Sequence, residues 1–163
     1  MTSTDLMEDL AERIAALWPE RMLYRDFCPN DHKRPSGFLY VRSAGFEDVN
    51  IGLVRWSVEA ELELFAATDA YTVESTEALR RDQDAVLILF GGPSIQVGDR
   101  HIPIYATAEA PGPGSAYVSF SAAWTDVRPG YHDPEDPGDP ETAQTPKMEH
   151  IEINNQCNKE ERT

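Results

Sequence analysis

A repeating pattern of apolar residues near the start of the chain predicts an amphipathic helix over Ser3–Leu17. Its apolar side chains recur at a spacing of three or four, while most of its charged side chains fall elsewhere. A polar residue among 3–5 is suited to capping the helix, and Pro19 closes the pattern. The apolar positions are Leu6, Met7, Leu10, Ile14 and Leu17.

Two short apolar and aromatic runs, at 22–27 and 37–43, predict two strands. Between them, residues 28–36 contain prolines together with Asn30 and Asp31, which are typical of a long exposed loop. The chain thus continues from the helix into two strands that a loop connects.

The next connection, at 44–52, carries three apolar side chains, Phe46, Val49 and Ile51, among polar residues. Exposed apolar side chains on a connection indicate a surface that contacts another molecule. We therefore predict that these three residues belong to an interface.

The clearest alternation in the chain lies at Leu53–Phe65, where apolar side chains alternate with polar or charged ones. A strand over these positions would extend about 43 Å, against about 17–20 Å for a usual strand. A domain of this size is too small to bury the whole apolar side of such a strand. We expect the strand to bend at a bulge or to extend past the core, where a neighbouring subunit would bury Trp56.

Residues 72–90 predict a second helix, which Thr72 would cap and which the Gly-Gly-Pro run at 91–93 would end. The continuous apolar run at 85–90 also fits a buried strand. We favour the helix.

Three further apolar runs, at Ile95–Val97, 102–109 and 116–126, predict a meander of strands joined by glycine-containing turns. Pro103 lacks a backbone donor, so the middle strand starts there or lies at an edge of the sheet. The order is helix, three strands, helix, and two or three strands. This order predicts an α+β fold of two layers, with a mainly antiparallel sheet covered by two helices.

The charge of the chain argues against direct binding to nucleic acid. Lys and Arg number 14 against 29 Asp and Glu, which gives a formal net charge of −15 that repels polyphosphate. Acidic, proline-rich sequence without periodicity fills the C-terminal part. We predict an α+β assembly domain at 1–127 and a flexible acidic tail at 128–163.

No constellation of catalytic or metal-binding residues stands out, so we predict neither an enzyme nor a cofactor or metal site. Cys28 and His32 have the spacing of zinc ligands, but the chain lacks a second pair at ligand spacing. Cys28 and Cys157 form no disulfide framework, and no segment has the pattern of a signal peptide or of a membrane span. We expect an intracellular protein that does not bind membranes.

Glu59, Glu61 and Glu63 fall on one side of the predicted long strand, about 7 Å apart. Three carboxylates at this spacing repel one another unless water, cations or arginine side chains screen them. A solvated sheet face is the first interpretation. The alternative is an acidic wall that faces a channel or a neighbouring subunit, where Arg80 and Arg81 of the second predicted helix would pair with it.

The order of these elements, together with short segments of sequence, resembles the tail terminator (tail completion) proteins of long-tailed bacteriophages. The resemblance covers about residues 4–128 and depends on element order and hydrophobic pattern. Besides the helix at 71–90, the segments are RIAALWP at 13–19, MLY at 22–24, GFLYV at 37–41 and WSVEAEL at 56–62.

The resemblance implies a non-enzymatic virion protein that forms a homo-oligomeric ring, typically a hexamer, after assembly in the host cytoplasm. Such a ring caps the tail tube protein, ends its polymerisation and joins the tail to a connector or neck protein of the head. DNA passes through its channel without specific binding, which agrees with the acidic charge and the three glutamates. The loops at 28–36 and 44–52 become candidate contacts with the tube or with neighbouring subunits.

Two other functions fit the sequence. A head-side connector or stopper protein would bind the portal assembly in place of the tube, and only the identity of the partner separates it from a terminator. A small-molecule-binding or catalytic domain is the third hypothesis. It is motivated by the three tryptophans and by the pocket that a curved sheet under two helices could enclose.

Overall fold

The computed structural model describes residues 1–67 and 76–132. Contacts divide the chain into two units, Met1–Arg128 and Pro129–Thr163, and every described helix and strand lies in the first. This unit is an α+β fold with two helices and a mainly antiparallel sheet, in the predicted order of helix, three strands, helix and further strands. The predicted fold class is therefore confirmed.

The elements have the following bounds. The helices are α1 (Ser3–Leu17) and α2 (Thr76–Leu89), and the strands are β1 (Met22–Arg25), β2 (Ser36–Asp48), β3 (Leu53–Phe65), β4 (Ile95–Val97), β5 (Arg100–Ile102), β6 (Ile104–Ala108) and β7 (Ser115–Val127).

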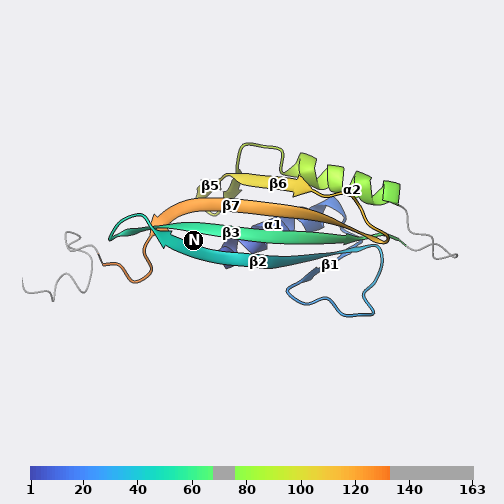
Figure 1. The fold of residues 1–163 in the computed structure, drawn as a ribbon, viewed down its shortest axis with the longest axis horizontal. Coiled ribbons are helices and arrows are strands. Elements are labelled where there is room, and N and C mark those ends of the chain that lie inside the picture. Colours follow the sequence, from blue (N-terminus) through green and yellow to red (C-terminus); the bar gives the residue numbers. More distant parts are fainter. Residues whose placement is uncertain (68–75, 133–163) are drawn as a thin grey trace, which may run out of the picture. The chain divides into compact units, whose positions relative to one another are not determined.

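Five strands form the main sheet, in the order β1-β2-β3-β7-β6 (Figure 1). β1 runs parallel to β2, and all the other neighbours are antiparallel. β2, β3 and β7 have 13 residues each, and β3 pairs with both of its neighbours along almost its full length. β4 and β5 form a separate hairpin. The predicted long strand is thus the centre of a sheet of long strands.

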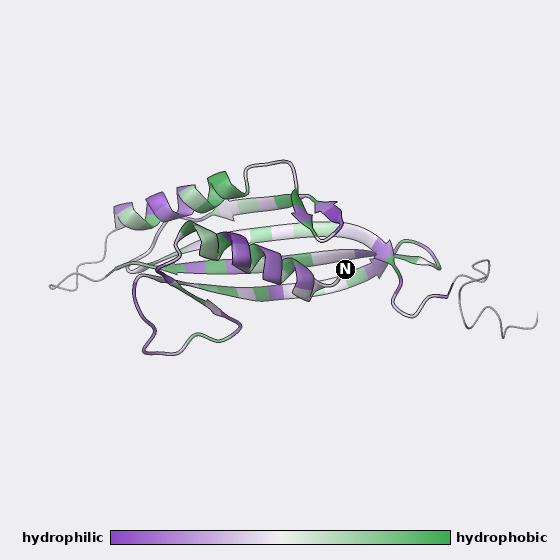
Figure 2. Cartoon of the chain, turned by 180° about the vertical axis from the view of Figure 1, so that it is seen from behind, coloured by the Kyte–Doolittle hydropathy of each residue, from purple (hydrophilic) through white to green (hydrophobic). Residues whose placement is uncertain are grey.

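The helices lie on one face of the sheet. Figure 2 shows α1 in front of the strands and α2 along the β6 side, and Figure 1, from the other side, shows α1 behind them. Leu6, Leu10 and Ile14 of α1 are buried on the sheet, as are Leu79 and Val86 of α2. No described helix covers the other face, which we call the open face. On β3, the side chains of the open face are Arg55, Ser57, Glu59, Glu61 and Glu63.

Thr2, and not one of residues 3–5, caps α1. Its hydroxyl accepts a hydrogen bond from the Asp5 amide at 3.3 Å, and the Asp5 carboxylate accepts one from the Thr2 amide at 2.7 Å. This reciprocal pair satisfies two backbone donors that the helix leaves free at its start. The helix ends at Leu17, before Pro19, as predicted.

The apolar side of β3 is covered within the chain, so the prediction that another subunit must bury it is wrong. Val54, Val58 and Leu62 are at most 2% exposed. The cover includes every apolar residue of this side except Trp56, which is half-buried, because the β4–β5 hairpin joins the helices, and its Ile95 and Ile102 enter the same core. The sequence gives no sign that this hairpin folds back onto the sheet.

β2 is longer than predicted, since it continues to Asp48 and takes up most of the connection expected at 44–52. Its register against β3 shifts between Val41 and Ser43, which marks a bulge at Arg42. That bulge breaks the alternation of apolar and polar residues that would have revealed the strand. The bulge predicted for β3 is therefore found in β2 instead, and the register of β3 against β7 has no shift.

β1 is shorter than predicted and ends at Arg25 instead of residue 27. The reason is Asp26, which has a φ of 58° and so turns the chain in the left-handed region that Asp tolerates. β1 consequently pairs with Ser36–Leu39 alone, and no other described strand pairs with the rest of that side of β2.

Pro103 divides the strand predicted at 102–109 into β5 and β6, and β6 is the edge strand of the main sheet. The expectation that Pro103 marks a strand start or a sheet edge is confirmed. Among the described residues α2 begins at Thr76, and the predicted cap, Thr72, lies outside them. Residues 85–89 are helical, which decides between helix and strand for that run.

A buried ion pair fixes the start of the chain to the end of β7. The terminal ammonium of Met1 lies 3.0 Å from one carboxylate oxygen of Asp126, and Arg100 lies 2.9 Å from the other. Burial alone would raise the pKa of Asp126, but hydrogen bonds from Met1 and from the Val127 amide, together with the charge of Arg100, hold it below its ordinary value. These contacts tie α1, β5 and β7 together.

Candidate assembly surface

Exposed apolar side chains gather where β2, β3 and β7 end together. We call these five residues the tip cluster. Its members, with their exposed fractions, are Phe46 (48%), Val49 (52%), Ile51 (82%), Leu53 (37%) and Val127 (55%). Apolar side chains concentrated at one end of a sheet are typical of a contact surface.

The turn between β2 and β3, which carries Val49 and Ile51 of the tip cluster, is held by hydrogen bonds. The Asn50 side chain accepts from the amides of Gly52 and Leu53 at 2.9 and 2.8 Å. Arg128 donates to the Ile51 carbonyl at 2.9 Å and to the Asp48 carboxylate at 2.8 Å. The turn therefore presents its apolar side chains in a fixed arrangement, which lowers the entropy cost of docking.

Trp56 lies in a row of aromatic rings that crosses three strands. Its ring stacks on that of Trp124, with centroids 5.9 Å apart, and lies 4.9 Å from that of Phe46. Trp124 is buried, Trp56 is half-buried and Phe46 is exposed, so burial falls steadily toward the β2 side. Phe46, Val49 and Ile51 are thus exposed as expected, while Trp56 is largely covered by its own chain. Their role in an interface stays a prediction.

The three glutamates lie on the open face, and each has a polar partner. Glu59 accepts a hydrogen bond from Ser43 at 3.2 Å. Glu61 accepts one from the Tyr40 hydroxyl and pairs with Arg42 at 3.2 Å. Glu63 accepts one from the Tyr117 hydroxyl at 2.8 Å.

Neighbouring strands therefore screen the repulsion that the glutamate spacing creates. The sequence alone does not reveal the two tyrosines as partners, because they come from β2 and β7, whose register only the structure shows.

The carboxylates raise the pKa values of the two phenols that face them. Partial burial and the hydrogen bond to Glu61 raise the pKa of Tyr40 well above its ordinary value. The hydrogen bond to Glu63, together with partial burial, raises the pKa of Tyr117. Both phenols act as hydrogen-bond donors only while they are protonated.

We expect Tyr40 to ionise above the ordinary tyrosine pKa of about 10. In an ultraviolet titration of phenolate, subtraction of the Tyr40→Phe curve from the wild-type curve isolates this group. Because the pKa is raised in the folded state, its contribution to stability is complete below pH about 10 and is lost as the pH rises further. Glu61→Gln serves as the control and should lower the Tyr40 midpoint. A difference curve centred at or below pH 10 in the wild-type background would contradict this assignment.

The remaining candidates from the sequence lie apart from these surfaces. Arg80 and Arg81 are exposed on α2, and Arg81 pairs with Glu77 of the same helix at 2.8 Å. The helix is on the covered side of the sheet, so neither arginine meets the glutamates within the chain. Cys28 and His32 are half-buried and not in open solvent, because the His32 ring packs 4.1 Å from that of Phe65.

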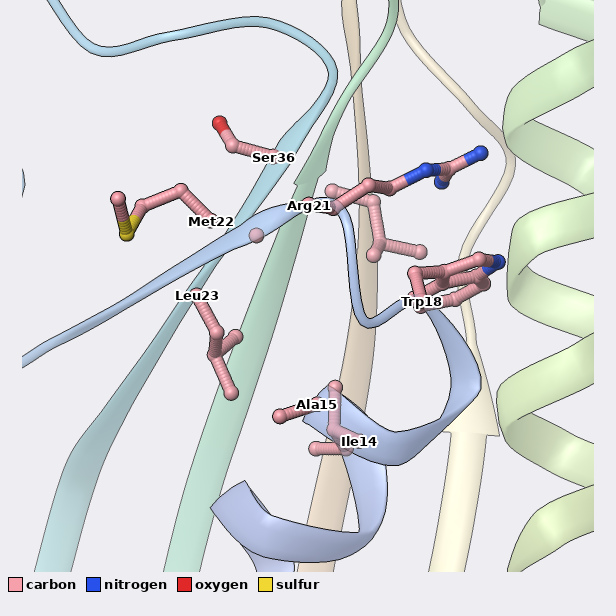
Figure 3. A pocket seen from close by; sticks show the side chains of 9 residues that line it. Ile14, Ala15, Trp18, Arg21, Met22, Leu23 and Ser36 are labelled. Atoms are coloured by element: carbon pink, nitrogen blue, oxygen red, sulfur yellow. The ribbon is translucent and has the colours of Figure 1, made fainter.

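Several cavities and hollows lie among the described residues, among them a hollow of about 520 Å³ beside Arg21 and Pro35. Figure 3 shows a cavity between α1 and β1, beside Ile14, Trp18 and Leu23. Its volume is about 10 Å³. That volume holds about one water molecule. A shallow hollow of about 190 Å³ lies on the open face, beside Arg42 and Glu59. No group of three or more metal-binding side chains occurs in the described ranges.

No family model and no curated protein matches the chain. Several solved structures are similar to the chain, and one of them matches 80% of this chain and 94% of its own, with 13% sequence identity and a TM-score of 0.42. A likeness at this identity and score carries no argument about function. Within 1–67 and 76–132, no helix is long and apolar enough to cross a membrane.

Proposed function

We propose that this chain is a structural subunit of a ring at the head–tail junction of a long-tailed bacteriophage, in the role of a tail terminator. The observation that supports this most is the one-sided sheet. Helices cover one face, while the open face is polar and carries Glu59, Glu61 and Glu63. A sheet whose uncovered face is polar suits the wall of a water-filled channel. The resemblance in element order favours the same function.

In such a ring the helices face outward and the open face lines the channel. Each copy then contributes its three glutamates, whose positions the hydroxyls of Tyr40 and Tyr117 fix. A channel wall of carboxylates and hydroxyls repels phosphate groups. DNA would therefore pass without binding, which agrees with the net charge of −15.

The tip cluster supplies a second feature that this function requires. It lies at one end of the three long strands, so a ring whose axis follows the strands gathers the tips of all copies on one rim. Val49 and Ile51 then form part of an apolar annulus, braced through Arg128. An annulus of this kind fits the end of the tail tube, whose last ring is the surface to be capped.

Purified protein, alone and with the tail-tube protein of the same phage, tests the proposal. We expect light scattering to report a closed oligomer, at the latest on tube ends, and negative-stain images to show rings that cap tubes and end their growth. A chain that stays monomeric and leaves tube growth unchanged would contradict it. Binding to the portal assembly and not to the tube would assign the chain to the head side of the junction.

A further inference from the structure

One edge of the main sheet is free over most of β2. β1 pairs only with Ser36–Leu39, and the Asp26 amide adds one last bond, to the Leu39 carbonyl at 3.2 Å. From Tyr40 to Asp48, no described strand lies on that side of β2. The free stretch exposes Val41 and Phe46 on its helix-covered side. Unpaired backbone groups next to apolar side chains form a template for another strand.

On the opposite edge of the same sheet, β6 is the last strand in the order, and among the described residues it pairs with β7 alone. Its Tyr105 is 70% exposed, and it has five residues, Ile104–Ala108, one fewer than the six residues of β2 after the bulge at Arg42. The sheet therefore ends on both sides in strands whose outer side pairs with no further described strand over most of β2 and over β6.

The strand directions decide how copies of the chain can join. β2 and β7 run one way, whereas β3 and β6 run the other. Rotation about an axis that follows the strands leaves these directions unchanged, so β6 of one copy meets β2 of the next in antiparallel orientation. Such a contact joins two different edges, and contacts of this kind form a ring when the rotation between successive copies closes.

We propose that the free stretch of β2 pairs with β6 of a neighbouring copy, so that the sheets of successive subunits form one continuous closed wall. This inference rests on the ring of the proposed function and names the surface that builds it. The antiparallel orientation places Glu109, just after β6, toward the Tyr40 end of the free stretch, where Arg42 is exposed. Opposite charges thus meet at that end, whereas the reverse orientation would bring Glu109 to Asp48.

The bulge at Arg42 has a place in this arrangement. A bulge blunts an edge strand against unwanted pairing. Here it separates the part of β2 that pairs with β1 from the part after the bulge, Ser43–Asp48, which stays available for pairing with another strand. Pairing between two β2 edges is the main alternative, and it would give a two-fold dimer that leaves β6 unused.

Cysteine cross-linking distinguishes these arrangements. In a Cys28→Ser, Cys157→Ser background, one cysteine is placed on β2 and one on β6, on the open face of both strands. The β2 positions are Ser43, Gly45 and Glu47, and the β6 positions are Tyr105 and Thr107, which makes six combinations. The positions on each strand are two residues apart, so that the combinations test different registers of the two strands. Different registers must be tested because a disulfide forms only when the Cα atoms lie within about 7 Å. A Cβ at Gly45 would meet nothing within 4 Å, so that site accepts the change.

We expect at least one combination, oxidised in ring preparations, to give a ladder of covalent oligomers up to the full ring on non-reducing gels. Each single cysteine, and the opposite-face control that pairs Ala44→Cys with Thr107→Cys, should give no ladder. Covalent dimers from Ser43→Cys or Gly45→Cys alone would contradict the inference. Rings seen by negative stain without a ladder from any combination would contradict it too, while leaving the proposed function intact. Absence of rings would remove both.

Discussion

Val49→Asp together with Ile51→Asp is expected to weaken docking of the ring on tail-tube ends by about 100-fold or more. Both side chains are exposed in the free chain, so the change costs little folding stability. In the docked state each carboxylate would be buried without a partner, at a cost of about 1–3 kcal/mol each. About 3 kcal/mol in total corresponds to two orders of magnitude in affinity. Co-sedimentation with preformed tubes, over a range of ring concentrations, measures the loss.

Thr4→Asp with Ala16→Asp is the matched control, because it adds the same charge to the exposed side of α1. This control should bind tubes as the wild type does. Urea unfolding of both variants checks that the fold is unchanged. If the tip variant capped tubes with unaltered affinity, the tip cluster would not be the docking surface.

Leu62→Ala is expected to lower the free energy of unfolding by about 3 kcal/mol. Leu62 is fully buried at the centre of β3, where its side chain packs between the sheet and the covering helices. The substitution removes apolar contact and leaves a cavity that the rigid sheet cannot close. Urea denaturation of the purified chain gives the difference directly.

Leu53→Ala provides the comparison on the same strand. Leu53 is 37% exposed at the strand end, so its loss should cost less than about 1 kcal/mol. Similar losses for the two variants would mean that the core is not centred on the covered side of β3.

The alternation at Leu53–Phe65 was sufficient to predict β3 to the residue, and the helical spacing did the same for α1. Both elements have one covered and one exposed side, which is the condition under which periodicity reveals structure. The continuation of β2 past Ser43 could not be predicted in this way. The bulge at Arg42 interrupts its alternation, and Gly45 disfavours a strand unless a neighbour such as β3 pairs with it.

The cover of Trp56 by its own chain could not be predicted for a different reason. Burial depends on what folds against a strand, and the length of the strand compared with the size of the domain does not show this. The β4–β5 hairpin and the stacked ring of Trp124 cover much of the apolar side that was predicted to need another subunit. The proposal that copies of this chain assemble is therefore supported by two other features, the tip cluster and the edge of β2 that no described strand covers.

The candidate site was predicted in part. Phe46, Val49 and Ile51 are exposed as expected, but Leu53 and Val127 join them only because three strands end at the same level. Such a meeting of distant positions depends on register, which a single sequence does not show.

The proposed function depends on which face of the sheet lines the channel. Electron cryomicroscopy of the chain bound to tail-tube ends measures this most directly. The sheet should line the channel with the side chains of Glu59, Glu61 and Glu63 directed at the axis, and α1 should lie on the outside. A map in which the helices faced the axis, or in which the tube ended without a ring of this chain, would contradict the assignment.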